Sequence, residues 1–592
     1  MCGIAGEIIS WPDGAERPNH ITRMVDALDH RGPDERGYLT RTVANGAERF
    51  QVNLGMSRLA IIDRQHGQQP MGRGCKVCFN GEIYNHAELR DELCHYRQFL
   101  THCDTEAIAH AYEIWGADFV GELDGMFAIA IWDEIPCILS LYRDRVGKKP
   151  LYYYHDSDKK ILLFASEIKA ILLHPAYKKA PNYAGLYHYI TLQYVPEPQT
   201  AFEGIRCVLP GHRLTYDPLT GCLKDMAYWD WSIDQPELSD RKARTQVAEL
   251  VTAAVDKRLE SEVPLGVYLS GGIDSAIITA LAARSERRPE ELHTFTMAFA
   301  EDQYNEAPLA QVIADEYKTI HHVERVPGLC LQEMAQKIVD QYDQPFGDCS
   351  AIPTMLLAKL SKQYITVALS GDGGDEAFGG YPRYWMSKGE QRVFFSCMMV
   401  WPPTLRDQVI AKTWRDKVTG QDTMQWLLQK ADQGPANDPW NRQMYADIVT
   451  YLPNDIIVKM ERATMAYSVE ARCPFLDSDV LDLSLSIPSR LKLNADSGKQ
   501  ILKDTFAHLL PAKTLQAPKR GFSVPVGEWL RQKEGFELLA KTIMDKSDRT
   551  GLFDRGMLNT VVTRHMARKD DYGHGIWILI MLDMWWRKHF GN

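Results

Sequence analysis

The sequence lacks long hydrophobic runs and has no surplus of positive charge. Its longest apolar stretches are Ile576 to Leu582, with seven residues, and Phe394 to Trp401, with about eight, whereas a membrane-spanning helix needs about 20. Lysine and arginine number 67 against 78 aspartates and glutamates, a net charge of −11. This acidic balance argues against nucleic acid or an anionic membrane as a partner, because both require a basic face.

A secretion signal and a disulfide framework are also missing. The N-terminus reads Met-Cys-Gly-Ile-Ala-Gly-Glu, without the basic region and apolar stretch of a secretory signal. Twelve cysteines among 592 residues fit a reduced, cytoplasmic setting better than a disulfide scaffold. Hydrophobic residues at 45% and charged residues at 24% are ordinary globular values. The length predicts roughly two to four domains.

The hydrophobic pattern divides the chain into a strand-rich first part and an alternating second part. Residues 2–215 contain short apolar segments such as Leu54 to Ile62 and Met126 to Trp132, which predict a sandwich of sheets with flanking helices. Residues 216–240 contain several prolines and predict a linker. In 241–592, strands and helices first alternate, which predicts a parallel sheet with helices on both faces, and a mostly helical remainder follows. The expected fold class is α/β.

Cys2 is the first residue with a chemical signature. Removal of the initiator methionine would leave it with both a thiol and a free α-amine. Because an α-amino group titrates near 7.7–8.0, it can act as the general base of its own nucleophile. A cysteine at the second position is by itself a weak signal.

Four further residues supply what the hydrolysis of a glutamine side chain requires. The guanidinium of Arg58 can hold an α-carboxylate bidentately, and the carboxylate of Asp104 can meet an α-ammonium. The Asn80 side chain and the Gly81 backbone N–H, at the end of a predicted strand, suit a tetrahedral oxyanion. Together with Cys2 they predict a glutaminase.

Cys2, Asn80 and Gly81 lie in motifs that resemble class II glutamine amidotransferases. The motifs are Met1-Cys2-Gly3-Ile4, His30-Arg31-Gly32-Pro33-Asp34, Asn80-Gly81-Glu82-Ile83-Tyr84-Asn85, Arg143-Asp144-Arg145 and Lys149-Pro150-Leu151-Tyr152. The resemblance implies an Ntn-type αββα sandwich over residues 2–215 with Cys2 as the catalytic nucleophile. It also implies an oxyanion hole at Asn80 and Gly81, and a glutamine site formed by Arg58, Asn80, Gly81, Glu82 and Asp104.

A second chemical signature is the loop Ser270-Gly271-Gly272-Ile273-Asp274-Ser275, which follows a predicted strand and opens a predicted helix. Its glycines let backbone N–H groups approach an anion at the helix N-terminus. The chain contains neither a Walker A loop nor a Gly-x-Gly-x-x-Gly motif. The loop instead resembles the diphosphate-binding loop of ATP pyrophosphatases, which cleave ATP to AMP and diphosphate.

The segment Ser370-Gly371-Asp372-Gly373-Gly374-Asp375 stands at the end of another predicted strand. Strand ends at the carboxyl edge of a parallel sheet gather ligand sites. Asp274 and Asp375, one from each loop, therefore predict a Mg²⁺ site beside the triphosphate of ATP, because Mg²⁺ commonly takes one or two carboxylates together with phosphate oxygens.

Nearly the whole chain resembles the glutamine-dependent asparagine synthetase family, through further motifs including Gln344 to Asp348, Ser468 to Asp477 and Lys519 to Phe522. The resemblance implies an ATP-pyrophosphatase-type domain over 241–592 and catalytic roles for Asp372 and Lys519. One position departs from the pattern, since Asp372 stands where the best-known members carry glutamate. The ATP site implied by the loop and the family comprises Leu269, Ser270, Gly271, Gly272, Asp274, Ser275, Met297, Ser370 and Gly371.

The implied reaction amidates L-aspartate to L-asparagine through β-aspartyl-AMP, with ammonia from glutamine and with ATP converted to AMP and diphosphate. A dry passage should join the two sites, although the sequence does not show what lines it. Two alternatives stay open. The first is a related enzyme that acts on another carboxylate, such as an envelope sugar or a natural-product intermediate. The second is a catalytically silent homologue, which the presence of Cys2, Asp274 and Asp375 disfavours. The family resemblance is compatible with a homodimer.

Two other patterns are given less weight. Cys75, Cys78, Cys94 and Cys103 have poor spacing for a zinc site and are expected to pack as small hydrophobic residues. Trp585 and Trp586, before a basic tripeptide, are expected to pack a final helix rather than contact a membrane.

Overall fold

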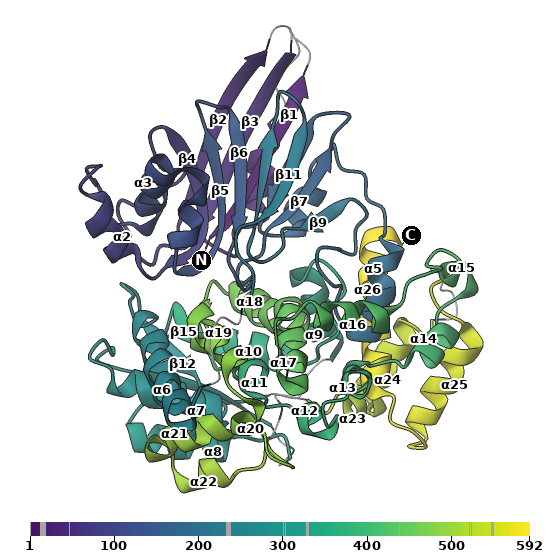
Figure 1. Ribbon diagram of the computed structural model, residues 1–592. Coiled ribbons are helices and arrows are strands. Elements are labelled where there is room, and N and C mark those ends of the chain that lie inside the picture. Colours follow the sequence, from purple (N-terminus) through teal and green to yellow (C-terminus); the bar gives the residue numbers. More distant parts are fainter. Residues whose placement is uncertain are drawn as a thin grey trace.

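The computed structural model describes residues 2–11, 19–45, 48–232, 238–299, 301, 303–326, 331–436, 438–519, 521, 524–545 and 550–591 (Figure 1). Part of the expected linker 216–240 lies outside the described residues.

Two antiparallel sheets stack face to face in the first part. One has the strand order β2-β3-β1-β8-β7-β9, and the other has the order β11-β10-β6-β5-β4. The strands are β1 (Gly3–Trp11), β2 (Glu35–Asn45), β3 (Glu48–Arg58), β4 (Cys75–Ile83), β5 (Gly125–Asp133), β6 (Ile138–Arg143), β7 (Tyr152–Asp156), β8 (Ile161–Ala165), β9 (Ile205–Cys207), β10 (His212–Asp217) and β11 (Cys222–Ala227).

Helices cover the outer faces of both sheets. They are α1 (Ile21–Asp26), α2 (His86–Leu93), α3 (Asp104–Trp115) and α4 (Ile168–Leu172), with the 3₁₀ helix η1 (Gly116–Glu122). The next helix, α5 (Tyr183–Leu192), lies among the helices of the second part (Figure 1), where the Tyr189 hydroxyl donates to the Ile578 carbonyl over 2.9 Å. Side-chain alternation along β4 shows the layering: Cys78 packs between the sheets with Ile4 and Trp132, whereas its neighbours Val77 and Phe79 pack against Ile108 of α3. This period of two is the pattern of a strand buried on both faces. The architecture is the expected αββα sandwich.

The second part is built on a five-stranded parallel sheet with the order β14-β13-β12-β15-β16. Its strands are β12 (Leu265–Tyr268), β13 (His293–Ala298), β14 (Ile320–Arg325), β15 (Val367–Leu369) and β16 (Glu470–Arg472). From β12 the chain builds the sheet first toward β14 and then, on the other side, toward β16. The order reverses between β12 and β15, which is where open α/β sheets bind ligands.

Helices cover both faces of this sheet and fill the remainder of the chain. In chain order they are α6 (Asp240–Lys257), α7 (Ile273–Arg284), α8 (Ala307–Tyr317), α9 (Leu331–Gln341), α10 (Ala351–Ser361), α11 (Gly374–Phe378), α12 (Pro382–Met386), α13 (Gln391–Met398), α14 (Pro403–Val409), α15 (Lys412–Arg415), α16 (Thr423–Asp432), α17 (Pro439–Val449), η2 (Leu452–Ile456), α18 (Ile457–Met465), η3 (Pro474–Leu476), α19 (Ser478–Ser486), α20 (Ser489–Lys492), α21 (Gln500–Phe506), η4 (Ala507–Leu509), α22 (Ala512–Gln516), α23 (Val526–Arg531), α24 (Lys533–Lys541), α25 (Arg555–Met566) and α26 (Gly573–Phe590).

The apolar run in α26 is explained by packing. Trp585 is fully buried, and its indole N–H donates to the Asp343 carbonyl over 2.7 Å. Ile576 to Leu582 are buried in the same hydrophobic core. Among the described residues, no helix is long and apolar enough to cross a membrane.

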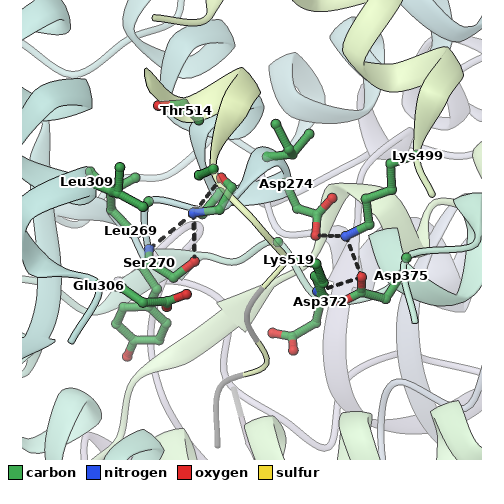
Figure 2. A pocket seen from close by; sticks show the side chains of 18 of the residues that line it. Leu269, Ser270, Asp274, Glu306, Leu309, Asp372, Asp375, Lys499, Thr514 and Lys519 are labelled. Carbon is green, nitrogen blue, oxygen red and sulfur yellow. Dashed lines mark hydrogen bonds and ion pairs between the residues drawn. The ribbon is translucent and has the colours of Figure 1, made fainter. Parts of the chain in front are cut away.

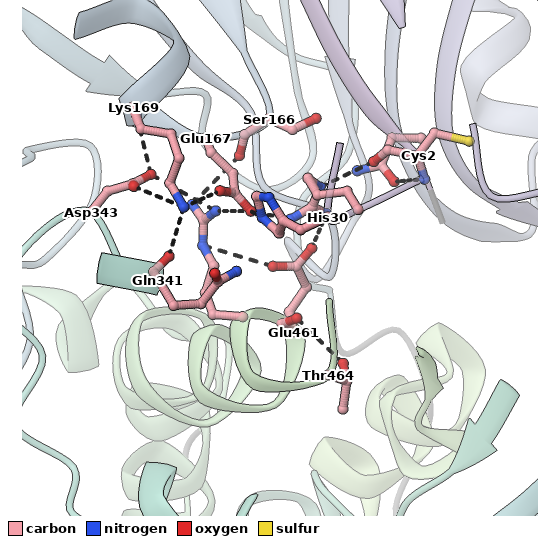
Figure 3. Close-up of polar contacts among 12 residues, drawn as sticks. Cys2, His30, Ser166, Glu167, Lys169, Gln341, Asp343, Glu461 and Thr464 are labelled. Atoms are coloured by element: carbon pink, nitrogen blue, oxygen red, sulfur yellow. Dashed lines mark hydrogen bonds and ion pairs between the residues drawn. The ribbon is translucent and has the colours of Figure 1, made fainter. Parts of the chain in front are cut away.

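A buried ion-pair network joins the two parts (Figure 3). Arg31 of the sandwich forms ion pairs with Glu167, at 2.7 Å, and with Glu461 of α18. Glu167 also lies 2.7 Å from Arg462 of α18 and 2.9 Å from Lys169. Burial opposes the charge on Glu167, but the surrounding His30, Lys169 and Arg462 hold the pKa of its carboxyl well below the usual range. One carboxylate thus compensates several buried cations across the interface.

We expect Glu167→Gln to destabilise the protein by about 3–5 kcal/mol, because it leaves Arg31 and Arg462 short of a counter-charge in a dry interface. The midpoint of urea unfolding checks this. Glu48→Gln is the matched control, since the Glu48–Lys160 pair is partly exposed and such pairs contribute about 0–1 kcal/mol. The pKa of Glu167 is lower in the folded protein than in the unfolded chain, so its contribution should be complete above about pH 4.5 and should decline as the pH falls further. If both variants unfolded at the same urea concentration, the buried network would not stabilise the protein more than an exposed ion pair does.

Candidate active sites

Cys2 immediately precedes β1, in the middle of the six-stranded sheet. Its backbone nitrogen donates to Asn80 Oδ1 over 3.0 Å, and its carbonyl accepts from Arg31 Nε over 3.1 Å. The nitrogen that methionine removal would convert to an α-amine is therefore already oriented by a side chain. Burial raises the pKa of the Cys2 thiol, while the Leu59 backbone and the Arg58 guanidinium oppose that shift. The thiol accordingly needs a base, which is the role expected of the α-amine.

Asn80 and Gly81 sit next to one another near the end of β4. Asn80 is fully buried, and its Nδ2 has no hydrogen-bond partner among the described residues. A buried donor without a partner is costly, unless a bound group accepts from it. A Cβ on Gly81 would lie 1.9 Å from the Met126 carbonyl oxygen of β5, so only glycine fits there. The geometry suits the expected oxyanion hole.

Arg58 is held more tightly than the sequence suggested. Its Nη2 donates to the Ile62 and Asp63 carbonyls at 3.1 and 2.8 Å, and its Nη1 lies 2.8 Å from Glu35 Oε2. The guanidinium thus organises the loop after β3, and binding a carboxylate through Nη1 would require it to exchange the contact with Glu35. Its role in glutamine binding stays a prediction.

Glu82 is buried on the same strand as Asn80, and Asp104 is buried next to the end of that strand. Asp104 begins α3, and its Oδ2 accepts from the Ile83 backbone N–H over 3.2 Å. Glu82 forms a 2.9 Å ion pair with Arg472 of β16, on the other side of the interface. Burial raises the pKa of both carboxyl groups, and Arg472 opposes the shift at Glu82. The predicted glutamine site therefore touches the second part directly.

The second site is a cavity of about 680 Å³ at the carboxyl edge of the parallel sheet (Figure 2). The structure brings together here every residue predicted to bind ATP, as well as Asp372, Asp375 and Lys519. They come from the loops after β12 and β15, from β13, and from the segment after α22. This is the switch point of the sheet.

Contacts within the protein fix the conformation of the 270–275 loop. Gly271 has φ +80°, and a Cβ there would lie 2.7 Å from the Ala310 nitrogen of α8. Ser275 Oγ accepts from the Ser270 backbone N–H over 3.2 Å, and Ser270 Oγ accepts from that of Gly272 over 3.3 Å. The loop runs directly into the N-terminus of α7, which is twelve residues long. Such a terminus favours a bound anion.

Asp274 and Asp375 face each other across a lysine that the sequence analysis missed. Lys499 Nζ forms ion pairs with both carboxylates, and Lys519 Nζ lies 2.7 Å from both oxygens of Asp375. Burial opposes ionisation, but Lys499 and Lys519 hold the pKa of Asp375 below its usual range, whereas burial raises the pKa of Asp274.

These carboxylates fit a magnesium site. Asp274 Oδ1 is buried without a hydrogen-bond partner among the described residues. A Cβ on Gly374 would lie 2.7 Å from that oxygen, and a Cβ on Gly380 would lie 1.8 Å from Asp375 Oδ1. Glycines thus leave space around both groups, and Lys499 compensates their charge.

Two further lysines were not identified from the sequence. Lys499 follows Gly498, where a Cβ would lie 1.8 Å from the carbonyl oxygen of Gly379, a residue far away in the sequence. This contact is tertiary, so it provides no local signal for Lys499. Lys459 of α18 lines the large cavity and lies 3.4 Å from Asp348. No local pattern distinguishes Lys459 from any other helical lysine.

A small cavity lies between the two sites. Its volume, about 20 Å³ for the centres of water-sized molecules, is enough for roughly one such molecule. Met126 at one side pairs with Glu82 across β4 and β5, while Asp372 and Met460 line both this cavity and the large one. The other lining residues are Lys148, Lys149, Ile457, Glu461, Ala471, Cys473 and Leu476.

Comparison with known proteins extends over the whole chain. The family description "Asparagine synthase" matches residues 246–587, and "Glutamine amidotransferase domain" matches residues 1–229. A glutamine-hydrolysing asparagine synthetase of Bacillus subtilis is 30% identical over 99% of this chain and 96% of its own. A putative one of Mycobacterium bovis is 30% identical over 99% of this chain and 97% of its own. Amidase chyE of Penicillium rubens is 26% identical over 97% and 96%, respectively.

Asn80→Ala should lower kcat for glutamine hydrolysis by about 10²–10³, because it removes one donor from the expected oxyanion hole. The KM for glutamine should change little, since the donor acts mainly on charge that develops during the reaction. Release of glutamate measures both constants, with Cys2→Ala as the inactive reference. A kcat within about twofold of wild type would show that Asn80 Nδ2 does not stabilise an oxyanion.

Asp274→Asn should reduce formation of AMP from ATP by about 10²-fold or more, because it removes a charge expected to bind the metal. Glutamine hydrolysis at Cys2 should persist and serves as the folding control. Chromatographic measurement of AMP and glutamate separates the two activities. Continued AMP formation at the wild-type rate would exclude Asp274 from the metal site.

Proposed function

Since this chain belongs to the glutamine-hydrolysing asparagine synthetase family, whose members are glutamine-dependent carbon–nitrogen ligases with ATP as co-substrate, we propose that its acceptor is L-aspartate and its product L-asparagine. The main support is that each site contains the residues expected for its half-reaction and that a small cavity lies close to both. Met126, whose carbonyl oxygen adjoins Gly81, lines this cavity, and Asp372 lines both it and the large cavity.

In the proposed first half-reaction, the Cys2 thiolate attacks the side-chain amide carbon of glutamine. The C–N bond breaks, ammonia leaves, and the resulting thioester is hydrolysed to glutamate. Asn80 Nδ2 and the Gly81 N–H would donate to the oxyanion. The unpartnered Nδ2 supports this role.

In the second half-reaction, a carboxylate oxygen of aspartate attacks the α-phosphorus of ATP, and diphosphate leaves. Adenylation is needed because a free carboxylate is a poor electrophile. Ammonia then attacks the acyl carbon, and AMP leaves. The Ser270–Ser275 loop and Lys519 would hold the phosphates. Bound Mg²⁺, held by Asp274 and Asp375, would neutralise charge on the phosphate oxygens.

The proposed acceptor is supported by the charges beside Asp372. Aspartate carries an α-carboxylate and an α-ammonium besides its reacting group. Lys459 supplies a cation at the wall of the large cavity, and Glu376 supplies a carboxyl group that accepts from Tyr381 Oη over 2.6 Å. Burial and the neighbouring Asp375 raise the pKa of Glu376 to about 7, so a nearby ammonium would favour its ionised form. Lys459 would then pair with the α-carboxylate of aspartate, and Glu376 with its α-ammonium.

Another carboxylate is the second candidate. One relative aligned over nearly the whole chain carries the name amidase and not asparagine synthetase. The site residues bind glutamine and ATP in either case, so they do not select the acceptor. Asp372 lines both cavities. Its side chain therefore belongs to the surface that would contact the acceptor and could distinguish one acceptor from another.

The test incubates the protein with ATP, Mg²⁺, ammonium chloride or glutamine, and a panel of acids that contains aspartate, glutamate, succinate and a uronic acid. Mass spectrometry measures each amide and AMP. We expect asparagine and AMP in equal amounts with aspartate, and much less amide with the other acids. Glutamate release without asparagine would contradict the proposed acceptor, and an amide formed from another acid would identify the replacement.

A further inference from the structure

Arg58 is connected to the second part of the chain through a single peptide group. Its Nη2 donates to the Ile62 carbonyl over 3.1 Å and to the Asp63 carbonyl over 2.8 Å. The peptide between Ile62 and Asp63 is trans, so its N–H points away from its C=O. That N–H donates to Glu262 Oε1 over 3.0 Å. The peptide therefore has the guanidinium of Arg58 on one side and the carboxylate of Glu262 on the other.

Glu262 brings this contact from the segment that leads into the parallel sheet. It lies three residues before Leu265, where β12 begins, and β12 leads directly to the 270–275 loop of the large cavity. Its backbone N–H also donates to the Ile61 carbonyl over 3.4 Å. The backbone and the side chain of Glu262 thus hold two successive peptide groups of the loop after β3. The residue is exposed, so substituting it leaves no cavity in a core.

The backbone conformation of Asp63 needs support from its surroundings. Its φ is +42°, in the left-handed region, which is costly for a residue other than glycine. Its carboxylate accepts from the backbone N–H groups of His66, over 3.2 Å, and of His102, over 2.7 Å. These bonds hold its side chain from within the sandwich, whereas Glu262 holds its backbone N–H. Without the bond from Glu262, the peptide before Asp63 is freer to rotate, and rotation turns its carbonyl away from the guanidinium.

We propose that Glu262 positions Arg58 for the α-carboxylate of glutamine, so that the second part of the chain completes the glutamine site of the first. This inference rests on the proposed glutamine site at Arg58. A guanidinium binds a carboxylate well only when its planar donors are aligned with it, and hydrogen bonds that run through one peptide polarise and strengthen one another. Nη1 has to exchange Glu35 for the substrate, and an anchored Nη2 keeps it in place. Glu262 touches no substrate, so it is a positioning residue that acts on glutamine binding and not on the attack by Cys2.

The test compares kcat and KM for glutamine, measured as release of glutamate, in wild type and in two variants of Glu262. Glu262→Ala should raise KM about fivefold, the effect of one hydrogen bond, and should leave kcat within about twofold of wild type. Glu262→Gln should have the wild-type KM, because its amide oxygen also accepts from a backbone N–H. A residue that acted only through its charge would not be replaced by glutamine in this way.

Three further measurements serve as controls. Glu113→Ala is the matched variant, because Glu113 Oε1 accepts from the Gly74 backbone N–H over the same 3.0 Å, and it should change neither constant. Arg58→Gln is the reference for a lost guanidinium and should raise KM more than Glu262→Ala does. The ammonium-supported rate, measured with whichever acid wild type amidates in the panel above, should be the same in Glu262→Ala and wild type, which shows that the variant is folded.

Three results would overturn the inference. A KM for Glu262→Ala within about twofold of wild type would show that Arg58 does not need this bond. A KM for Glu262→Gln as high as that for Glu262→Ala would show that the bond to the peptide is not what matters. A lower kcat with an unchanged KM would place the effect on the chemistry at Cys2. Failure of the proposed glutamine site is recognised separately, because Arg58→Gln would then leave KM unchanged, and failure of the proposed acceptor shows in wild type with the panel.

Discussion

The structure depends most on the buried ion pairs of Arg31. This one guanidinium contacts the carbonyl of Cys2, the carboxylate of Glu167 and the carboxylate of Glu461. Charges taken out of water are tolerated only when every one of them is compensated. The position of Cys2, the proposed nucleophile, is therefore coupled to the position of α18. Because α18 carries Lys459 and Met460 to the wall of the ATP cavity, the same contacts set the positions of both sites.

Electrostatic compensation also governs the ATP site. Two aspartates brought close together repel each other, and burial makes the repulsion stronger. Lys499 and Lys519 offset this repulsion. A triphosphate and Mg²⁺, if bound here as proposed, would bring charges of both signs to these lysines and aspartates. Such a site is held in shape before it is filled, which reduces the reorganisation needed during reaction.

The proposed transfer of ammonia would favour a small space between the sites. Ammonia is a nucleophile only when neutral, and water would protonate it. A cavity with room for roughly one small molecule, walled by Met126, Ile457, Met460 and Leu476, leaves little space for the water chain that protonation requires.

Sequence reasoning was most successful where the signal is local. The strand–loop–helix order around Ser270 to Ser275, the Asn80-Gly81 pair at the end of β4 and the alternation of strands and helices all follow from residues close together in the chain. From these the α/β class, the αββα sandwich, the parallel sheet and the family were predicted and are confirmed. The roles of the individual site residues and the domain boundaries stay predictions, and β11 lies within the segment expected to be a linker.

The tertiary structure determined which side chains contact one another. The sequence by itself determined that a cysteine, an anion-binding loop and two aspartates exist in the right local settings, because backbone geometry and short motifs are encoded within a few residues. Only packing decided that Glu461 meets Arg31 from 430 residues away, and that Lys499 lies between Asp274 and Asp375. Those facts depend on which surfaces exclude water together, and that is a property of the whole fold and not of any segment.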